Sequence, residues 1–163
     1  MPTNTELALQ VLDAINAHDT GALRALWPPE MTERFPDRTL HGPDELAAYF
    51  EGLFAALPDF HMEVVRTAEE GDAVFVRWRL TGTHTGGAFS GIETTGKRIE
   101  VDGMDHFTVQ DGKVVSNFVV FDQMEVARGL GLLPPDGSTA DRALKSAFNA
   151  KTRIADAIRE ARK

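Results

Sequence analysis

The chain of 163 residues has no cysteine, and this absence excludes several kinds of chemistry. Disulfides, thiolate metal sites, iron–sulfur clusters and a cysteine nucleophile all need that residue. A small disulfide-stapled secreted scaffold is therefore not expected, and a reducing cytoplasm is the expected location. The sequence also lacks an apolar run near the roughly 18 residues of a membrane span. Its first residues lack the charged and apolar regions of a signal peptide.

Basic residues are scarce, because 17 Lys and Arg stand against 25 Asp and Glu, for a net charge of −8. Nucleic acids and anionic membranes attract proteins with excess positive charge, so neither partner is expected. The imbalance is uneven along the chain. Residues 138–163 contain seven of the basic but only three of the acidic residues, which gives this tail +4 and leaves −12 for the rest. Two units with different roles are therefore expected.

The spacing of apolar residues, which changes along the chain, predicts an α+β fold. Residues 4–18, 20–26 and 42–57 have the apolar spacing of amphipathic helices. After residue 60 the apolar residues recur at every second position, as in strands, and turn signals such as Asp111-Gly112 separate the strand segments. Helices followed by strands in hairpin succession are typical of an antiparallel sheet packed on helices. The predicted strands are 60–68, 73–83, 98–109 and 114–121, and residues 31–35 are weakly strand-like.

Both faces of this sheet carry side chains that need cover. Val74, Val76, Trp78 and Leu80 share one face of their strand, and the residues between them share the other. Helices are expected on one side, and a second subunit is a candidate for the other. We therefore expect a homodimer.

The tail is predicted to be separate from the body, with residues 1–133 as the main domain and 134–163 as a linker and basic helix. Pro134 to Gly137 form a break, and Ser138 is placed to cap a long helix with a thin apolar stripe. Such a helix needs a surface to pack on. Its own acidic body and the partner subunit are both candidates. A membrane surface is disfavoured because the apolar face is rich in alanine and lacks tryptophan.

Several common catalytic signatures are absent. The glycine-rich stretch 82–91 has neither the Lys-Ser/Thr of a phosphate loop nor the glycine spacing of a dinucleotide site. Ser90 lacks the preceding glycine of a nucleophile elbow. The five histidines (His18, His41, His61, His84 and His106) are scattered, so no metal site is expected.

Polar residues gather on the last two predicted strands, with Asp102, Asp105 and His106 on one and Asn117 and Asp122 on or after the next. The loop between the strands decides which share a face. A two-residue loop pairs 110 with 113 and puts Asp105 with Ser116, Phe118, Val120 and Asp122. A three-residue loop pairs 109 with 113 and puts Asp105 with Asn117, Val119 and Phe121. The second is favoured because Gly112 suits a left-handed bulge position.

These motifs resemble a known family. Gly42-Pro43-Asp44-Glu45-Leu46, Gly103-Met-Asp105-His-Phe107 and Asp111-Gly112-Lys113 are similar, in order and spacing, to the SnoaL-like polyketide cyclases of the nuclear transport factor two-like superfamily. The resemblance covers roughly residues 5–133. It implies a cone-shaped, curved antiparallel sheet packed on N-terminal helices, with an apolar pocket and dimerisation through the convex face. The C-terminal helix is extra to that fold.

The resemblance also implies a chemistry. Family cyclases close a ring by an intramolecular aldol step, with an aspartate of the last strand as acid and base and without cofactor or metal. This sequence has Asn117-Phe118-Val119 there, and Val119 cannot transfer a proton. Asp105 matches a position where the superfamily often has a polar catalytic side chain, including the acid of ketosteroid isomerases.

The leading hypothesis is therefore a protein that binds a hydrophobic, oxygenated small molecule and catalyses a proton transfer such as cyclisation or isomerisation. Burial should raise the pKa of Asp105, the expected catalytic residue. A non-catalytic ligand-binding or dimerisation module is the alternative, which Val119 favours. The expected ligand-binding residues are Trp78, Phe107 and Phe121 as the wall, His84 and Asn117 as orienting groups, and Asp122 at the mouth.

Each polar candidate also has a purely structural interpretation. Asp105 could pair with Arg77, Arg79 or Arg98 across the sheet. Asp122 is well placed to cap the short helix that follows it. His84 could serve as a hydrogen-bond partner within its own loop.

Overall fold

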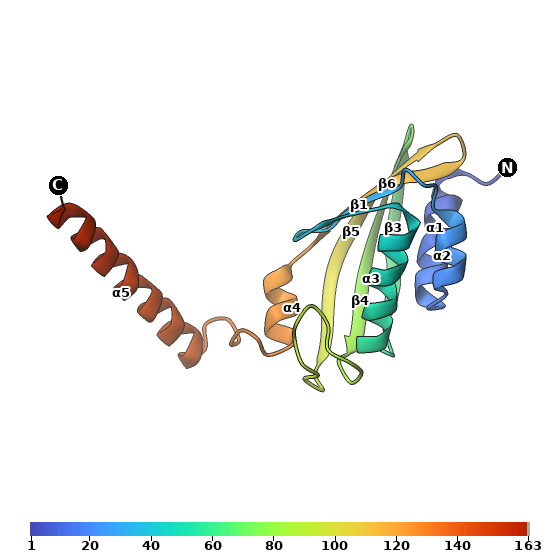
Figure 1. Cartoon of the computed structure of the whole chain (residues 1–163). Coiled ribbons are helices and arrows are strands. Elements are labelled where there is room, and N and C mark those ends of the chain that lie inside the picture. Colours follow the sequence, from blue (N-terminus) through green and yellow to red (C-terminus); the bar gives the residue numbers. More distant parts are fainter. Residues whose placement is uncertain (163) are drawn as a thin grey trace.

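The structure is a computed structural model that describes residues 1–162; Lys163, the last residue of the predicted tail, lies outside the described residues. Three helices come first, four long strands follow, and two helices end the chain (Figure 1). The elements are α1 (Asn4–Asn16), α2 (Thr20–Leu26), β1 (Thr32–Arg34), β2 (Thr39–His41), α3 (Gly42–Ala56), β3 (His61–Glu70), β4 (Ala73–Thr83), β5 (Arg98–Gln110), β6 (Lys113–Phe121), α4 (Gln123–Gly129) and α5 (Thr139–Ala161).

The helices begin where the sequence provides caps. Thr3 and Glu6 form a complete capping box at α1, and the Asp19 side chain accepts a hydrogen bond from the Ala22 amide at α2. Pro43 stands in the first turn of α3, where a missing N–H costs nothing. The predicted bounds of these three helices agree with the structure to within two residues.

The strands form one curved sheet in the order β2-β1-β6-β5-β4-β3. Helices α1 to α3 lie along one side of it (Figure 1). The predicted α+β fold with a curved sheet packed on helices is confirmed. One pairing differs from the expected antiparallel pattern, because β1 runs parallel to β6. Strands β1 and β2 have only three residues each, which is too short for periodicity to reveal them fully.

The loop between β5 and β6 has two residues, so the prediction of a three-residue loop is wrong. Asp111 and Gly112 both have positive φ, of 50° and 71°, as a two-residue type I′ turn requires. Gln110 pairs with Lys113 on either side of the turn.

A β-bulge corrects the register two residues later. Val109 pairs with Val114 but Thr108 pairs with Ser116, so Val115 is an extra residue in β6. Beyond the bulge Asp105 lies opposite Val119. Asp105 therefore shares the concave face with Asn117, Val119 and Phe121, as expected, although the extra residue sits in the strand instead of in the turn.

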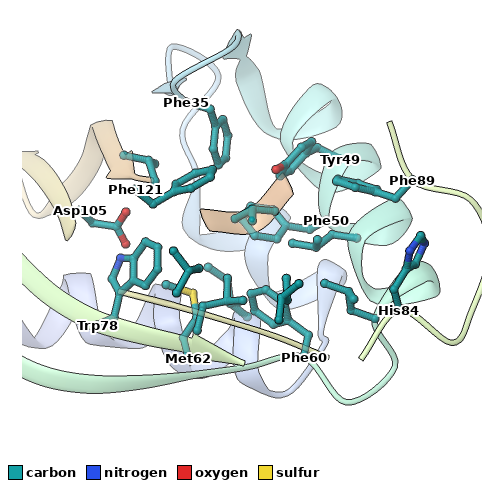
Figure 2. A pocket seen from close by; sticks show the side chains of 18 of the residues that line it. Phe35, Tyr49, Phe50, Phe60, Met62, Trp78, His84, Phe89, Asp105 and Phe121 are labelled. Carbon is teal, nitrogen blue, oxygen red and sulfur yellow. The ribbon is translucent and has the colours of Figure 1, made fainter. Parts of the chain in front are cut away.

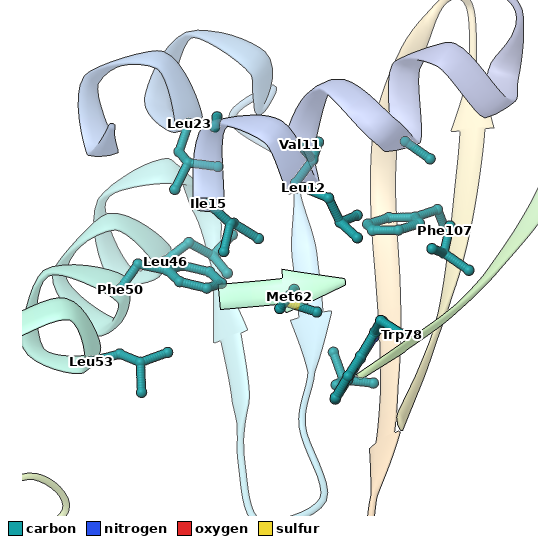
Figure 3. Close-up of a cluster of buried hydrophobic side chains, with 14 of the residues drawn as sticks. Val11, Leu12, Ile15, Leu23, Leu46, Phe50, Leu53, Met62, Trp78 and Phe107 are labelled. Carbon is teal, nitrogen blue, oxygen red and sulfur yellow. The ribbon is translucent and has the colours of Figure 1, made fainter. Parts of the chain in front are cut away.

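The concave face of the sheet forms the core with the helices. Trp78 and Phe107 from the strands pack beneath α1 and α3 with Leu12 and Met62 (Figure 3). Glycine at position 103 gives the Trp78 ring its place, because a Cβ atom would lie 2.2 Å from Cη2 of Trp78. The missing side chain lets the indole ring lie across β5.

The convex face carries a group of ion pairs and, beside it, a group of exposed apolar side chains. Arg77 and Arg79 bond to Asp102 across β4 and β5, at 3.4 and 3.2 Å. Beyond this ion-pair group, the side chains of Met104, Phe118 and Val120 are exposed by 41–45%. These three residues form what we call the convex patch.

Helix α5 leaves the body of the protein (Figure 1). Ser138 caps it as predicted, and its buried residue is Asp141, in the first turn. The apolar stripe of Leu144, Phe148, Ile154 and Ile158 is 49–67% exposed. The first turns of α5 lie beside α4, where Met124, Arg128, Leu144 and Phe148 line one groove. No helix in residues 1–162 has the length and apolar character needed to cross a membrane.

Candidate functional site

A cavity opens between the concave face of the sheet and helices α3 and α4. Nearly all of the side chains that line it are apolar, and the centres of water-sized molecules can occupy about 130 Å³ of it. Aromatic rings from several elements form its walls (Figure 2). Its four polar lining residues are Glu33, Tyr49, His84 and Asp105. Apolar walls with a few polar groups are typical of a small-molecule site.

Asp105 lies at one end of this cavity, beside Trp78 and Phe121 (Figure 2). Its side chain comes from the middle of β5, and the residue is 3% exposed. Burial raises the pKa of this carboxyl to about 7, while contacts with Asn117 and Trp78 offset part of the increase. A carboxyl with such a pKa exchanges a proton readily near neutral pH.

The ion-pair interpretation of Asp105 is wrong. Arg77 and Arg79 face the opposite side of the sheet, where they bond to Asp102. Arg98 lies 3.8 Å from Asp59. Within residues 1–162 Asp105 therefore has no basic partner that would keep it ionised.

Glu33 is a second buried acid in the cavity, and the sequence analysis missed it. It is 4% exposed and comes from β1. Burial, and next the charge of Asp105, raise the pKa of Glu33 to about 8, although a hydrogen bond from Asn117 offsets part of this. The available signal was its place between Met31 and Phe35, since alternate residues of a strand share a face and both neighbours are buried.

Asn117 lies behind the two acids and does not line the cavity. Its Nδ2 atom donates a hydrogen bond to Oε1 of Glu33 at 3.0 Å, and its amide also contacts Asp105. Its Oδ1 atom is buried without a hydrogen-bond partner. The structure thus places Asn117 between the acids and not against a ligand.

His84 lines the opposite end of the cavity from Asp105 (Figure 2). The Thr95 amide donates to its Nδ1 at 3.4 Å, so Nε2 carries the hydrogen and donates to the Gly87 carbonyl at 3.0 Å. Both ring nitrogens are therefore used within the loop 84–97. The imidazole stabilises that loop and leaves only ring surface for a ligand.

The remaining expected ligand contacts divide into two groups. Trp78 and Phe121 line the cavity, with ring centres 6.4 Å apart. Phe107 is 1% exposed and packs under α1 (Figure 3), so a ligand in the cavity cannot reach it. Asp122 is exposed and accepts hydrogen bonds from the Met124 and Glu125 amides, as the N-cap of α4. Neither Phe107 nor Asp122 lines the cavity.

Much of the aromatic wall comes from residues that the sequence analysis did not select. Tyr49 and Phe50 extend from α3, Phe35 follows β1, and Phe89 comes from the loop 84–97. The Tyr49 ring contacts the Phe35 and Phe89 rings, with centres 4.7 and 5.7 Å apart. Burial raises the pKa of the Tyr49 phenol, which remains a neutral donor. Flat, apolar molecules fit walls of this kind.

The polar groups of the cavity suit proton transfer. Two acids, Glu33 and Asp105, line the cavity, and the charge of Asp105 acts on Glu33. A bound molecule with an oxygen near the acids could exchange hydrogen bonds and protons with them.

Comparisons with known proteins agree with this geometry. The family model for SnoaL-like polyketide cyclases matches residues 5–130. AclR, a candidate hydroxylase from Streptomyces galilaeus, is 27% identical with a TM-score of 0.72, over 98% of this chain and 96% of that one. TsrD from Streptomyces laurentii is 25% identical with a TM-score of 0.70, over 79% and 95%. A SnoaL-like polyketide cyclase from Agrobacterium tumefaciens, at 18% identity and a TM-score of 0.66 over 80% and 100%, shares the fold. The sequence gives no match among curated proteins.

Proposed function

Because the chain belongs to the SnoaL-like polyketide cyclase family, we propose that it binds a hydrophobic, oxygenated small molecule and catalyses a cofactor-free proton transfer on it. Cyclisation or isomerisation is the reaction type. The observation that carries this proposal is Asp105, a buried carboxyl without a basic partner at the end of an apolar cavity. Its pKa of about 7 suits a group that both takes up and releases a proton.

Both reaction types begin with the same step. A base removes a proton from the carbon next to a carbonyl group, and the carbonyl oxygen gains negative charge that a hydrogen-bond donor stabilises. The apolar walls strengthen both interactions because they exclude water. Asp105 acts as the acid and base, and Trp78 and Phe121 hold the ligand against it.

The position of Val119 supports Asp105 in this role. In the resemblance described above, the family's catalytic aspartate falls at Val119, which cannot transfer a proton. Val119 on β6 lies directly opposite Asp105 on β5. Side chains paired in this way have Cβ atoms about 5 Å apart. A carboxyl on β5 therefore reaches the same region of the cavity as one on β6.

A non-catalytic ligand-binding module is the second candidate. The observation that favours it is the identity of residue 119, a valine where the family resemblance expects the catalytic aspartate. In that case the cavity would bind its ligand and Asp105 would serve only as a hydrogen-bonding group. The two candidates differ in turnover and not in binding, so a single variant separates them.

The test uses 2-tetralone, a bicyclic ketone with exchangeable hydrogens next to its carbonyl. Exchange of these hydrogens for deuterium in heavy water is followed by proton NMR, and binding by saturation-transfer NMR on the same samples. Asp105→Asn keeps the shape of the side chain but removes the acid and base. Asp102→Asn is the matched control, because Asp102 lies on the same strand with its side chain on the convex face.

The wild-type protein should accelerate exchange, and Asp105→Asn should slow it by about 100-fold or more, the usual contribution of a positioned acid or base. Binding should change little, and Asp102→Asn should behave as the wild type. Equal exchange in Asp105→Asn and wild type would remove the catalytic role. Binding without exchange in every sample would favour the non-catalytic module.

We also propose that two copies of the chain associate through the convex patch. Met104, Phe118 and Val120 form an exposed apolar group on the central strands β5 and β6. A contiguous apolar surface of this kind usually marks a contact with another protein. Dimerisation through the convex face, which the family resemblance implies, would cover it.

A further inference from the structure

We infer that α5 pairs antiparallel with α5 of a second copy of the chain, around a two-fold axis at Lys151. The contact surface is the apolar stripe of the helix, formed by Leu144, Phe148, Ile154 and Ile158. The contact is separate from the convex patch, and it does not depend on the proposed reaction. It gives a role to the one long helix that contributes nothing to the cavity.

The apolar stripe is open to water along the whole length of α5. Its four large side chains are 49–67% exposed. The helix otherwise consists mainly of alanine and of polar or charged residues, so its apolar character is confined to one side. Because long helices of this kind owe most of their stability to packing of the apolar face, the stripe calls for a partner surface.

The junction with α4 holds the helix in this exposed position. Asp141 in the first turn is 4% exposed and accepts hydrogen bonds from the Gly137 amide at 3.0 Å and from Nζ of Lys145 at 2.6 Å. Asp136 in the preceding loop lies 3.1 Å from Nζ of Lys145 and 3.5 Å from the Arg128 guanidinium of α4. These contacts tie the first turns of α5 to α4, and the remaining turns project from the body (Figure 1).

The spacing of the stripe is symmetrical about Lys151, and this symmetry points to a second copy as the partner. Leu144 and Ile158 stand seven residues before and after Lys151, and Phe148 and Ile154 stand three residues before and after it. With 3.6 residues per turn, both intervals return to the same broad side of the helix. A two-fold axis at Lys151 therefore brings the first half of one stripe onto the second half of the other, as a self-complementary contact requires.

This register places large side chains opposite small ones. Phe148 of one copy lies opposite Ala155 of the second copy, and Ile154 lies opposite Ala147 of the second copy. All four residues are exposed in the single chain, so they are free to meet. Alternation of large and small residues across a contact lets the side chains interdigitate and the helices approach closely.

The charges beside the stripe are complementary in the same register. Lys145 lies opposite Asp156 of the second copy, on the same flank of the helix pair, and the two side chains are 60% and 54% exposed. The two-fold axis repeats this pair of opposite charges, which favours the antiparallel register. Lys151 faces Lys151 of the second copy at the axis, but its long side chain lets each ammonium group extend into water.

The groove between α4 and α5 provides a place for the end of the second helix. Met124 and Leu133 line it together with Leu144 and Phe148, which also belong to the stripe. Ile158 of the second copy reaches Leu144 in the antiparallel register. The last turns of the second α5 therefore lie along this groove and cover its apolar wall.

A single introduced cysteine can test the pair, because the chain has no cysteine of its own. Lys151→Cys places a thiol on the two-fold axis. Packed helices lie roughly 8–10 Å apart and their Cα atoms lie about 2.3 Å from each axis, so the facing Cα atoms are about 4–5 Å apart, within reach of a disulfide. Arg153→Cys is the matched control, because residue 153 lies on the far side of the helix, well beyond the roughly 7 Å that a disulfide spans.

Both full-length variants are oxidised with glutathione disulfide, and covalent dimers are measured on non-reducing gels. Lys151→Cys should form dimers at least about tenfold faster than Arg153→Cys, because the contact raises the effective concentration of its thiols. Equal rates, or the absence of a dimer from Lys151→Cys, would overturn the α5 pair and would mean that the stripe covers some other surface. The result does not depend on any ligand, so it is distinguishable from a failure of the proposed function.

A second change in the Lys151→Cys protein tests the stripe itself. Ile154→Glu puts a charge into the contact and should lower the rate of dimer formation to that of Arg153→Cys. Ser146→Glu adds the same charge on the polar side of the helix and should leave the rate unchanged. Equal loss in the two variants would contradict a contact through the stripe.

Discussion

Replacing Gly103 with alanine tests how closely the sheet, Trp78 and the cavity fit together. The new Cβ atom would lie 2.2 Å from Cη2, 2.4 Å from Cζ2 and 2.6 Å from Cζ3 of the Trp78 ring. Ordinary contact begins at 3.4 Å, so the ring has to move by about 1 Å or more. Trp78 is otherwise buried, and the cavity is the open space beside it. The ring should therefore move into the cavity.

The expected cost follows from overpacking, which typically destabilises a core by about 1–3 kcal/mol. Alanine in a strand recovers roughly 0.5–1 kcal/mol relative to glycine, because the unfolded chain loses less freedom. A net loss of about 1–2 kcal/mol remains. For a protein of this size that loss lowers Tm by about 2–8 °C. The displaced ring should also weaken 2-tetralone binding by about tenfold.

A double-mutant cycle identifies the ring as the cause. Trp78→Phe removes the outer ring atoms that the new methyl group meets, so Gly103→Ala combined with Trp78→Phe should lose about 1 kcal/mol less stability than the two single variants together. Urea unfolding measures all four proteins. Gly87→Ala is the control, because a Cβ atom there meets nothing within 4 Å. Additive losses, or a Gly103→Ala protein as stable as the wild type, would refute this description of the packing.

Two further predictions concern the convex patch and the loop 84–97. Val120→Glu should convert a dimer into monomers in sedimentation experiments, whereas Ala48→Glu on the exposed face of α3 should not; a wild type that is monomeric at every concentration contradicts the proposed dimer. His84→Ala should destabilise the protein by about 1–2 kcal/mol and speed hydrogen exchange of the Thr95 amide, because its acceptor is lost. Thr85→Ala in the same loop should leave that exchange unchanged, and equal exchange in both variants would exclude the hydrogen-bonding role of His84.

Local chemistry explains why so much of the fold was predictable. Thr3, Asp19 and Ser138 cap their helices with side chains that can be identified from the sequence. The alternation of β4 likewise assigns Trp78 to the buried face before any partner is known. These signals depend on neighbours within four residues, so no knowledge of the tertiary structure is needed.

The two acids of the cavity, Glu33 and Asp105, illustrate what local signals cannot provide. Glu33 meets Asn117 only because β1 pairs in parallel with β6, across 84 residues of sequence. A three-residue strand has little periodicity of its own. The alternation of Met31, Glu33 and Phe35 shows that Glu33 faces inward, but the nearby Asp105 becomes visible only in the assembled sheet.

The position of the cavity was equally hidden. Phe107 and Phe121 lie on the same concave face, and both are aromatic. Helix α1 covers the end of β5 that contains Phe107, whereas the end near Phe121 stays open below α3 and α4. Periodicity identifies which residues face inward, but only the placement of the helices decides where the interior is filled and where it is hollow.

The bulge at Val115 has a consequence for the gene. It is in effect a one-residue insertion that β6 absorbs, because the pairing on both sides of it is regular. Without the Val115 codon, the pair of Val109 with Val114 would be followed directly by the pair of Thr108 with Ser116, in one unbroken ladder. Asn117 and Val119 would keep their partners on β5. Loss of a codon beyond Val119 would not be absorbed in this way, because the pairing there contains no extra residue. Alignments of this chain with relatives should therefore accept a gap at Val115, and a hairpin one residue shorter can hold Asp105 in the same place.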